Sequence, residues 1–142
     1  MKTVRDILEV KGYHVWSIGP SASIFDALEL MADREVGALM VTEGTKVIGI
    51  ISERDYARKV ILKGGSSKSM QVKEIMTTHV VFTRLQHNVE ECMTLMTEKH
   101  IRHLPVIEAD QLVGVISIGD LVKSIITEQK FIIEQLEQYI HG

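Results

Sequence analysis

The apolar and polar positions of this chain follow one pattern twice. Residues 36–61 align with residues 101–126 at an offset of 65, and eight of the 26 aligned pairs are identical. The two segments include GIISERD, which starts at Gly49, and GVISIGD, which starts at Gly114. The same offset also pairs apolar residues at i, i+4 and i+7, which are Ile24, Leu28 and Met31 in one half and Val89, Met93 and Met96 in the other. This is the spacing of one helix face against a core, so the repeat predicts two copies of one structural unit.

Each half predicts the same order of elements, β-α-β-β-α. Serine or asparagine before the apolar helix face is a good N-cap, and two β-branched runs joined by a polar turn indicate a hairpin. A second helix is expected to begin at each Ser-x-x-Asp. The expected elements are amphipathic turns at 4–8 and 72–76, strands at 15–18 and 80–83, helices after Ser23 and Asn88, hairpins over 38–52 and 103–117, and helices from 52 and 117. The turns align at an offset of 68, so the first half has three extra residues around Lys11 to His14.

The predicted fold class is α/β in the broad sense, or α+β, with two repeats and a long C-terminal helix. The repeats are assigned to residues 1–65 and 66–127, with the polar joint KGGSSKS at 63–69, and a helical tail is assigned to 128–142. Neither half is large enough to bury its sheet face and both helices alone. We therefore expect one compact unit in which the halves pack with approximate two-fold symmetry.

The tail contains no helix breaker before Gly142, so residues 118–140 are read as one long helix or two abutting ones. Its apolar residues Ile126, Ile133, Leu136 and Ile140 fall close to one face. Such a stripe is typical of docking on the protein's own core or on a second subunit. Acidic residues outnumber basic ones in the tail, which argues against a membrane surface.

Composition narrows the class of protein. The chain of 142 residues is 45% hydrophobic and 25% charged with a net charge of −3, as in soluble globular proteins. No apolar run is long enough to cross a bilayer, and no signal peptide opens the sequence, which predicts a cytoplasmic protein. The net charge gives no general footprint for nucleic acid. The single cysteine, Cys92, excludes an internal disulfide and lies on an apolar helix face, where packing is expected.

The two Ser-x-x-Asp segments, Ser52 to Asp55 and Ser117 to Asp120, have two interpretations. A serine at the N-cap and an acidic residue at N3 form a variant of the capping box. The same geometry brings a hydroxyl, free N–H groups and a carboxylate to the start of a helix, a common place for nucleotides. A carboxylate there would repel phosphate but would accept hydrogen bonds from the hydroxyls of a ribose. Arginines nearby would then hold the phosphates.

The duplicated G-h-h-S-x-x-D segments, the HLPV run at 103–106 and the repeated element order resemble a tandem pair of CBS domains, often called a Bateman module. The resemblance covers nearly the whole chain. It implies a regulatory module, not an enzyme, with clefts between the halves for adenosine-containing ligands such as AMP, ADP, ATP or NAD. It also implies a homodimer. The tail resembles the ending of stand-alone bacterial CBS-pair proteins.

By position, the resemblance nominates a set of ligand-binding residues. The aspartates would bind ribose hydroxyls, with the motif serines beside them and a hydroxyl on the first strand. Backbone and side chains at the start of the later strands would line the base pockets, and basic residues would bind phosphate. The nominated residues are Ser17, Val36, Gly37, Ala38, Leu39, Ser52, Arg54, Asp55, Arg58, Arg102, His103, Leu104, Ser117 and Asp120. The first half lacks the proline of the L-P-V run, and the second has Phe82 and Leu85 where the family commonly has a hydroxyl residue and a proline, so the clefts are expected to differ.

Other constellations carry less weight. His100-x-x-His103 has a plausible metal spacing, but the helix is expected to end between the two residues, so no metal site is predicted. Trp16 suits a strand core or a base at a cleft mouth. Nucleic acid is disfavoured because the basic stretch from Arg54 lies in an otherwise acidic chain.

Three functions remain to be compared. The leading one is a non-enzymatic adenine-nucleotide sensor, and the partner that receives its output is not indicated. The second is an enzyme, because CBS pairs occur inside inosine monophosphate dehydrogenases, but 142 residues leave no room for that barrel. The third is a protein-interaction or scaffold module with empty clefts, in which the Ser-x-x-Asp segments are only helix caps.

Overall fold

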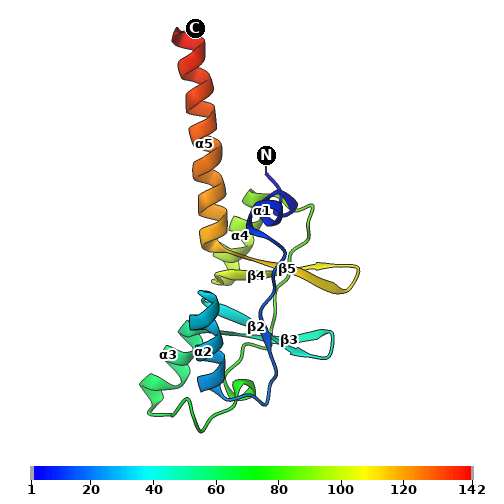
Figure 1. Cartoon of the computed structure of the whole chain (residues 1–142), viewed down its shortest axis with the longest axis vertical. Helices are drawn as coiled ribbons and strands as arrows, with labels where there is room; N and C mark the ends of the chain where they lie inside the picture. The colour runs from blue at the N-terminus through cyan, green and yellow to red at the C-terminus, as the bar shows by residue number, and fades with distance from the viewer. Residues whose placement is uncertain (1, 142) are drawn as a thin grey trace.

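The computed structural model describes residues 2–141, which form two lobes and one long projecting helix (Figure 1). The predicted element order is present in the first half and, apart from its first strand, in the second half. The elements are α1 (Val4–Lys11), β1 (Ser17–Ile18), α2 (Ile24–Arg34), β2 (Ala38–Glu43), β3 (Lys46–Ser52), α3 (Glu53–Lys59), η1 (Ile61–Lys63), η2 (Val72–Glu74), α4 (Val89–Lys99), β4 (His103–Glu108), β5 (Gln111–Ser117) and α5 (Ile118–His141). The single helix α5 settles the two readings of the C-terminal region in favour of one continuous helix.

The predicted helix starts are confirmed by their caps. The Ser23 hydroxyl accepts from the backbone N–H of Asp26 at 3.0 Å, and the Asn88 side chain accepts from that of Glu91 at 2.8 Å. Both helices end in a non-glycine residue in the left-handed region, Glu35 at φ 54° and His100 at φ 55°. These turns bring the chain sharply back into the next strand.

The two hairpins are confirmed, but the first strand of the second half is not. In the first lobe β1 runs parallel to β2, and β2 is antiparallel to β3. In the second lobe β4 and β5 form the hairpin, while the strand expected at 80–83 is reduced to one parallel bridge between Thr83 and Val106. The physical reason is proline: the N–H of Met40 donates to the carbonyl of Trp16 at 3.1 Å, and the equivalent of Met40 is Pro105, which has no N–H.

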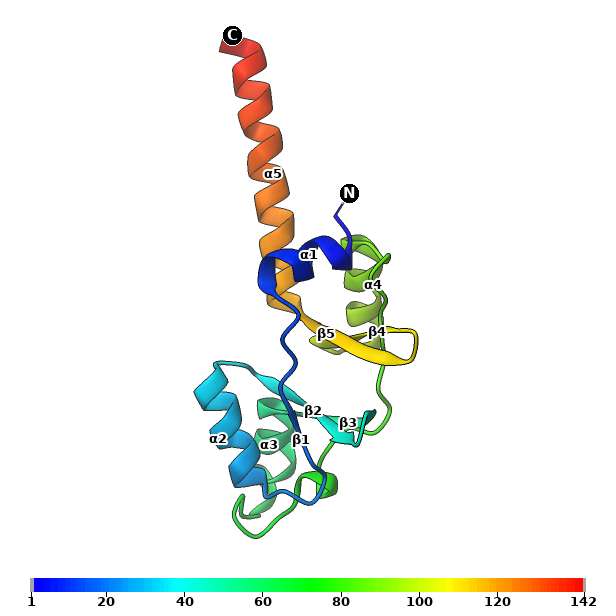
Figure 2. The ribbon, with the colours of Figure 1, turned by 45° about the vertical axis from the view of Figure 1, so that its right-hand side comes forward.

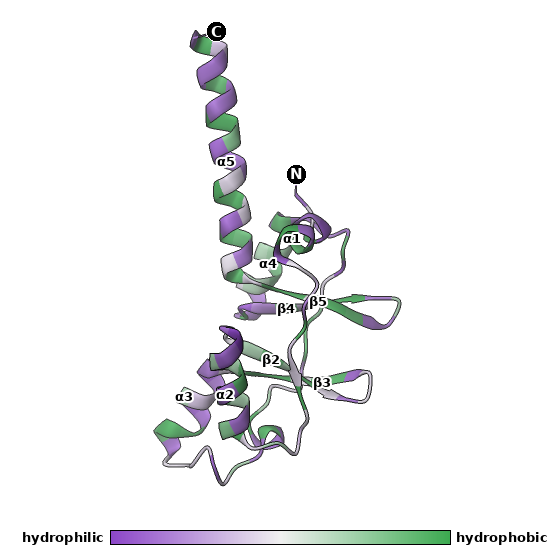
Figure 3. Ribbon diagram, viewed as in Figure 1, coloured by the Kyte–Doolittle hydropathy of each residue, from purple (hydrophilic) through white to green (hydrophobic). Residues whose placement is uncertain are grey.

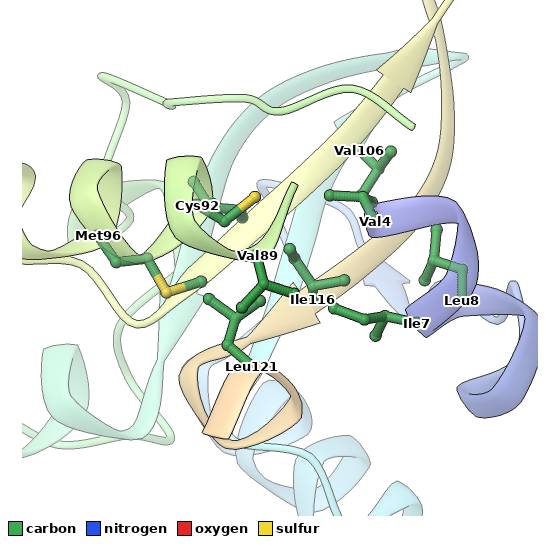
Figure 4. Close-up of a cluster of buried hydrophobic side chains, with 10 residues drawn as sticks. Val4, Ile7, Leu8, Val89, Cys92, Met96, Val106, Ile116 and Leu121 are labelled. Atoms are coloured by element: carbon green, nitrogen blue, oxygen red, sulfur yellow. The ribbon is translucent and has the colours of Figure 1, made fainter. Parts of the chain in front are cut away.

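The leading helical segments are exchanged between the lobes. Helix α1 of the first half packs with Val4, Ile7 and Leu8 into the core of the second lobe, beside Val106 and Ile116 (Figure 4). The short helix η2 of the second half places Val72 and Ile75 in the core of the first lobe, with residues of α2, β2 and β3. Each core is therefore completed by a segment from the other half of the sequence. This exchange crosses the boundary predicted at residue 65.

Matched backbone hydrogen bonds hold the exchanged segments. The N–H of Val89, at the start of α4, donates to the carbonyl of Lys2 at 3.0 Å. The N–H of Ile24, at the start of α2, donates to the carbonyl of Met70 at 3.0 Å. As a result, two extended segments cross between the lobes, 12–16 in one direction and 77–82 in the other (Figure 2).

The duplicated glycines permit this exchange. A Cβ on Gly114 of β5 would lie 2.8 Å from Cδ1 of Leu8, which is fully buried. A Cβ on Gly49 of β3 would lie 2.8 Å from Sδ of Met76 and 3.0 Å from the carbonyl oxygen of Thr77. Glycine is therefore required at the first position of each G-h-h-S-x-x-D segment by the close approach of an exchanged segment.

Cys92 and the core methionines behave as predicted. Cys92 is 1% exposed, and Met31 and Met96 are 2% exposed within the two cores. Burial raises the pKa of the Cys92 thiol above its ordinary value, as expected for a packing residue.

Gly114→Ala is expected to lower the free energy of unfolding by about 1–3 kcal/mol, because the new methyl group displaces Leu8 in a filled core. Gly119→Ala is the control, since a Cβ there meets only Ser117 Oγ at 3.6 Å and alanine favours the helix. Urea unfolding of both variants measures the difference, and equal stabilities would contradict this account of Gly114.

Candidate functional site

Two clefts lie where the crossing segments pass between the lobes. Each is walled by one crossing segment, by the Ser-x-x-Asp helix start of one half, and by the turn into the second strand of the other half. We name them after their aspartates. The Asp55 cleft has a volume of about 480 Å³ and the Asp120 cleft about 390 Å³.

The linings of the clefts follow the repeat. Around the Asp55 cleft lie Gly37, Ile50, Ser52, Glu53, Arg54, Asp55, Arg58, Lys59, Thr77, His79, Val80, Val81, His100, Ile101, Arg102 and His103. Around the Asp120 cleft lie Lys11, Gly12, His14, Trp16, Glu35, Val36, Gly37, Ala38, Met40, His103, Val115, Ser117 and Asp120. Gly37 and His103 line both clefts and so lie between them.

The capping interpretation of Ser-x-x-Asp is confirmed in the first half. Ser52 is the N-cap of α3; its N–H donates to Asp55 Oδ2 at 3.0 Å, and its hydroxyl accepts from the N–H of Asp55 at 3.2 Å. In the second half the same two bonds join Ser117 and Asp120, at 2.8 and 3.2 Å. Capping and ligand binding are compatible, because a carboxylate has two oxygens and capping takes only one.

Each aspartate also has a lysine partner that the sequence did not reveal. Lys59 Nζ lies 3.2 Å from Asp55 Oδ1, one helical turn away, and donates to the carbonyl of Ile75 at 2.9 Å. Lys11 Nζ lies 2.7 Å from Asp120 Oδ2 and donates to the carbonyl of Val115 at 2.8 Å. Lys11 ends α1, just where the first half has its extra residues.

The two ion pairs therefore arise differently. Lys59 belongs to the same helix as its aspartate, whereas Lys11 comes from the exchanged helix of the other half. The Asp55 and Asp120 side chains are 14% and 22% exposed, so both remain accessible from the clefts.

His103 stands between the clefts as a neutral imidazole. Burial is the main cause that lowers the pKa of His103 from its ordinary value of 6.5, and the charge of Lys11 adds to it. Asp120 opposes this shift in pKa, and Arg102 lowers the pKa further. At neutral pH, His103 therefore adds no charge to either cleft.

The structure brings together most of the nominated residues. Ser52, Arg54, Asp55, Arg58, Arg102 and His103 meet in the Asp55 cleft, and Val36, Gly37, Ala38, Ser117 and Asp120 meet in the Asp120 cleft. The wall of the Asp55 cleft around residues 100–103 comes from the second half, and that of the Asp120 cleft around residues 35–38 comes from the first.

Three nominations are corrected. Leu39 and Leu104 are 0% exposed and belong to the two cores, so neither lines a cleft. Successive side chains of a strand point to opposite faces, which turns each leucine away from the residue before it, Ala38 or His103. Ser17 is exposed on β1 and is not a lining residue of either cleft.

Sequence reasoning nominated no ligand-binding residue on the crossing segments, although it considered Trp16 for a base at a cleft mouth. Thr77, His79, Val80 and Val81 line one cleft, and Lys11, Gly12, His14 and Trp16 line the other. Trp16 is half-buried there, with the Arg34 guanidinium 4.2 Å from its ring centroid and the His14 ring stacked at 6.2 Å. Besides Trp16, the three-residue difference between the halves was a hint that these segments matter.

Residues 2–141 provide neither a metal cluster nor a helical membrane span. In that range no group of three His, Cys, Asp or Glu side chains is placed to hold a metal ion. No helix in it is both long enough and apolar enough to cross a membrane.

Comparison with known proteins agrees with this architecture. The family model for the CBS domain matches residues 4–62 and 72–127. The mitochondrial CBS domain-containing protein CBSX3 of Arabidopsis thaliana is 37% identical over 150 residues, covering 99% of this chain and 72% of that protein. A solved CBS-domain structure from Burkholderia ambifaria is 46% identical with a TM-score of 0.87, covering 90% of this chain and 96% of the other.

A more distant structure shares the fold. The CBS domain pair of protein MJ0100, solved with 5′-methylthioadenosine and S-adenosyl-L-methionine, is 22% identical with a TM-score of 0.79, covering 90% of this chain and 98% of that one. The chain belongs to the CBS-domain family and carries two CBS domains, a CBS pair, the type of module that serves regulation.

The stability of the protein should depend on the protonation of His103. Because the pKa of His103 is lower in the folded protein than its ordinary 6.5, the unfolded chain binds more protons below that pH. The free energy of unfolding is therefore fully retained above pH 6.5 and declines as the pH falls toward the pKa of the folded state. His103→Gln should flatten the profile below pH 6.5.

Chemical unfolding at half-unit pH steps measures this slope. His141→Gln is the matched control, because His141 is exposed at the end of α5. If wild type and His103→Gln lose stability in parallel over that interval, His103 is not the group responsible.

Proposed function

We propose that this CBS pair is a regulatory module that binds adenosine-containing ligands, of the AMP, ADP, ATP or NAD class, in the clefts between its halves. The observation that carries the proposal is the position of the two aspartates. Each lies at a helix start and faces a cleft, and each retains exposed surface after capping. A ribose diol has the two donors that such a carboxylate accepts.

Cleft size and composition support the proposal. Volumes of about 480 and 390 Å³ lie within the usual range of roughly 300–1,000 Å³ for small-molecule sites. Apolar side chains from a crossing segment, such as Val80 and Val81, offer a surface for a flat base. The MJ0100 domain pair, which shares this fold, was solved in complex with two adenosine-type ligands.

The architecture offers a route from binding to regulation. Both halves wall each cleft, so a ligand that contacts both favours one arrangement of the lobes over another. Such a shift can be no larger than the difference in the ligand's affinity for the two arrangements. Ligand-dependent movement of the lobes is the proposed output of the module.

We also propose that the module acts as a homodimer through α5. This helix projects from the second lobe with alternating apolar and polar patches (Figures 1 and 3). Ile126, Ile133 and Ile140 recur every seven residues and are 49%, 54% and 73% exposed, with Leu136 between them at 56%. Apolar residues at this spacing are typical of helices that pair in a coiled coil, so the proposed occupant of this face is α5 of a second copy.

The competing function is a protein-interaction module with empty clefts. One observation favours it: the capping boxes are complete without a ligand, and Lys11 already pairs with Asp120. In that case the aspartates contribute stability alone.

Asp55→Ala and Asp6→Ala separate these functions. Asp6 makes the same capping box with Thr3 at the start of α1, at 2.9 and 3.3 Å, but lines neither cleft. A saturating adenine nucleotide, at about 100 times its dissociation constant, should raise the melting temperature of wild type and Asp6→Ala by about 5–10 °C. Asp55→Ala or Asp120→Ala should lose that shift, according to which cleft binds.

Thermal unfolding with AMP, ADP, ATP and NAD makes the measurement. If both cleft variants lose only as much stability as Asp6→Ala and keep the full ligand shift, the aspartates are helix caps and not ribose ligands. If no ligand shifts wild type, the interaction module replaces the sensor.

The dimer has its own test. Ile133→Glu should convert the dimer to a monomer in sedimentation velocity, because it places two like charges in the apolar seam. Gln135→Glu adds the same charge on the opposite side of α5 and should leave the dimer intact. A wild-type protein that sediments as a monomer at tens of micromolar would exclude this interface.

A further inference from the structure

The two clefts carry opposite charge. Four cationic side chains and two carboxylates line the Asp55 cleft, which leaves a formal surplus of two positive charges with histidine neutral. One lysine and two carboxylates line the Asp120 cleft, which leaves a surplus of one negative charge. The repeat in the backbone is therefore not a repeat in electrostatics.

The positive charges of the Asp55 cleft are available to a ligand. Lys59 pairs with Asp55, but within residues 2–141 Arg54, Arg58 and Arg102 make no ion pair, and all three are exposed. Arg54 and Arg58 lie one turn apart on α3, and Arg102 reaches the cleft from the other half. Guanidinium groups on two facing walls are suited to several phosphate groups at once, since each binds a phosphate in a fork.

The Asp120 cleft has no comparable cation. Its one lysine, Lys11, is held by Asp120 and by the carbonyl of Val115. Arg34 lies nearby over the Trp16 ring but is not a lining residue. Glu35, in the left-handed turn after α2, adds a carboxylate that would repel phosphate.

We propose that the clefts are specialised by charge: the Asp55 cleft takes an adenine nucleotide with a polyphosphate chain, and the Asp120 cleft takes an adenosine-type ligand without phosphate. This inference rests on the proposed function and adds which ligand class each cleft selects. In the Asp120 cleft the ribose competes with Lys11 for the carboxylate, so binding there loosens a contact made by the exchanged helix α1. In the Asp55 cleft the phosphate chain draws Arg102 of one half toward Arg54 and Arg58 of the other.

The chain contains its own reporter for this division. Trp16 is the single tryptophan, and it lines only the Asp120 cleft. Its fluorescence therefore responds to a ligand in that cleft, while calorimetry detects a ligand in either.

ATP and 5′-methylthioadenosine, an uncharged nucleoside, are titrated separately into the full chain with both readouts. ATP should give heat with unchanged tryptophan fluorescence. Its affinity should fall about tenfold or more in Arg58→Gln/Arg102→Gln and should weaken as salt rises. The nucleoside should change the fluorescence, keep its affinity in the arginine variant and lose it in Asp120→Asn. Arg84→Gln, an exposed arginine outside both clefts, is the control and should change neither titration.

The possible outcomes separate a failure of the charge specialisation from a failure of the proposed ligand binding. If ATP changes Trp16 fluorescence at the concentrations that give heat, and the arginine variant binds it normally, the specialisation is wrong although nucleotide binding stands. If the nucleoside binds with unchanged Trp16 fluorescence and with Asp120→Asn unaffected, the specialisation is also wrong. If neither compound gives heat or a fluorescence change, the proposed function fails and the specialisation fails with it.

Discussion

The reciprocal exchange of leading segments is the constraint on which the rest of the structure depends. Leu8 of α1 fills the second lobe against Gly114, and Met76 fills the first lobe against Gly49. The first helical segment of each half packs in the core of the other lobe. The chain therefore has to cross between the lobes twice. The crossings create the two clefts, and no separate element is needed to build them.

The same arrangement places the aspartates where helix capping and the proposed ligand binding coincide. Asp55 and Asp120 each hold a helix start of their own half and face a crossing segment. The lysines make the clefts unequal. Lys59 ties its aspartate to its own helix, whereas Lys11 ties Asp120 to the exchanged helix. Lys59 nevertheless also donates to the carbonyl of Ile75, directly after the exchanged helix η2. Each ion pair is therefore in contact with a segment exchanged between the lobes.

Structural features that depend on interactions between residues close in sequence were predicted from local sequence patterns. The caps at Ser23 and Asn88, the hairpins, the long tail helix and burial of Cys92 all follow from short-range spacing, and all are present. Leu39 and Leu104 were misplaced because a motif match ignores which face of the strand a residue occupies. The exchange of α1 and η2 could not be predicted, since an amphipathic turn fits either core equally well. The pairing of Lys11 with Asp120 depends on this exchange. It could not be predicted either, because the two residues lie 109 positions apart in the sequence.

The central claim is that these carboxylates hold a ribose between the two halves. A crystal structure of the protein grown with ATP tests it most directly. The account predicts the ribose hydroxyls within hydrogen-bond distance of the Asp55 carboxylate, with the adenine against the crossing segment at 77–81. ATP bound outside both clefts, or a ribose that contacts neither aspartate, would contradict the account.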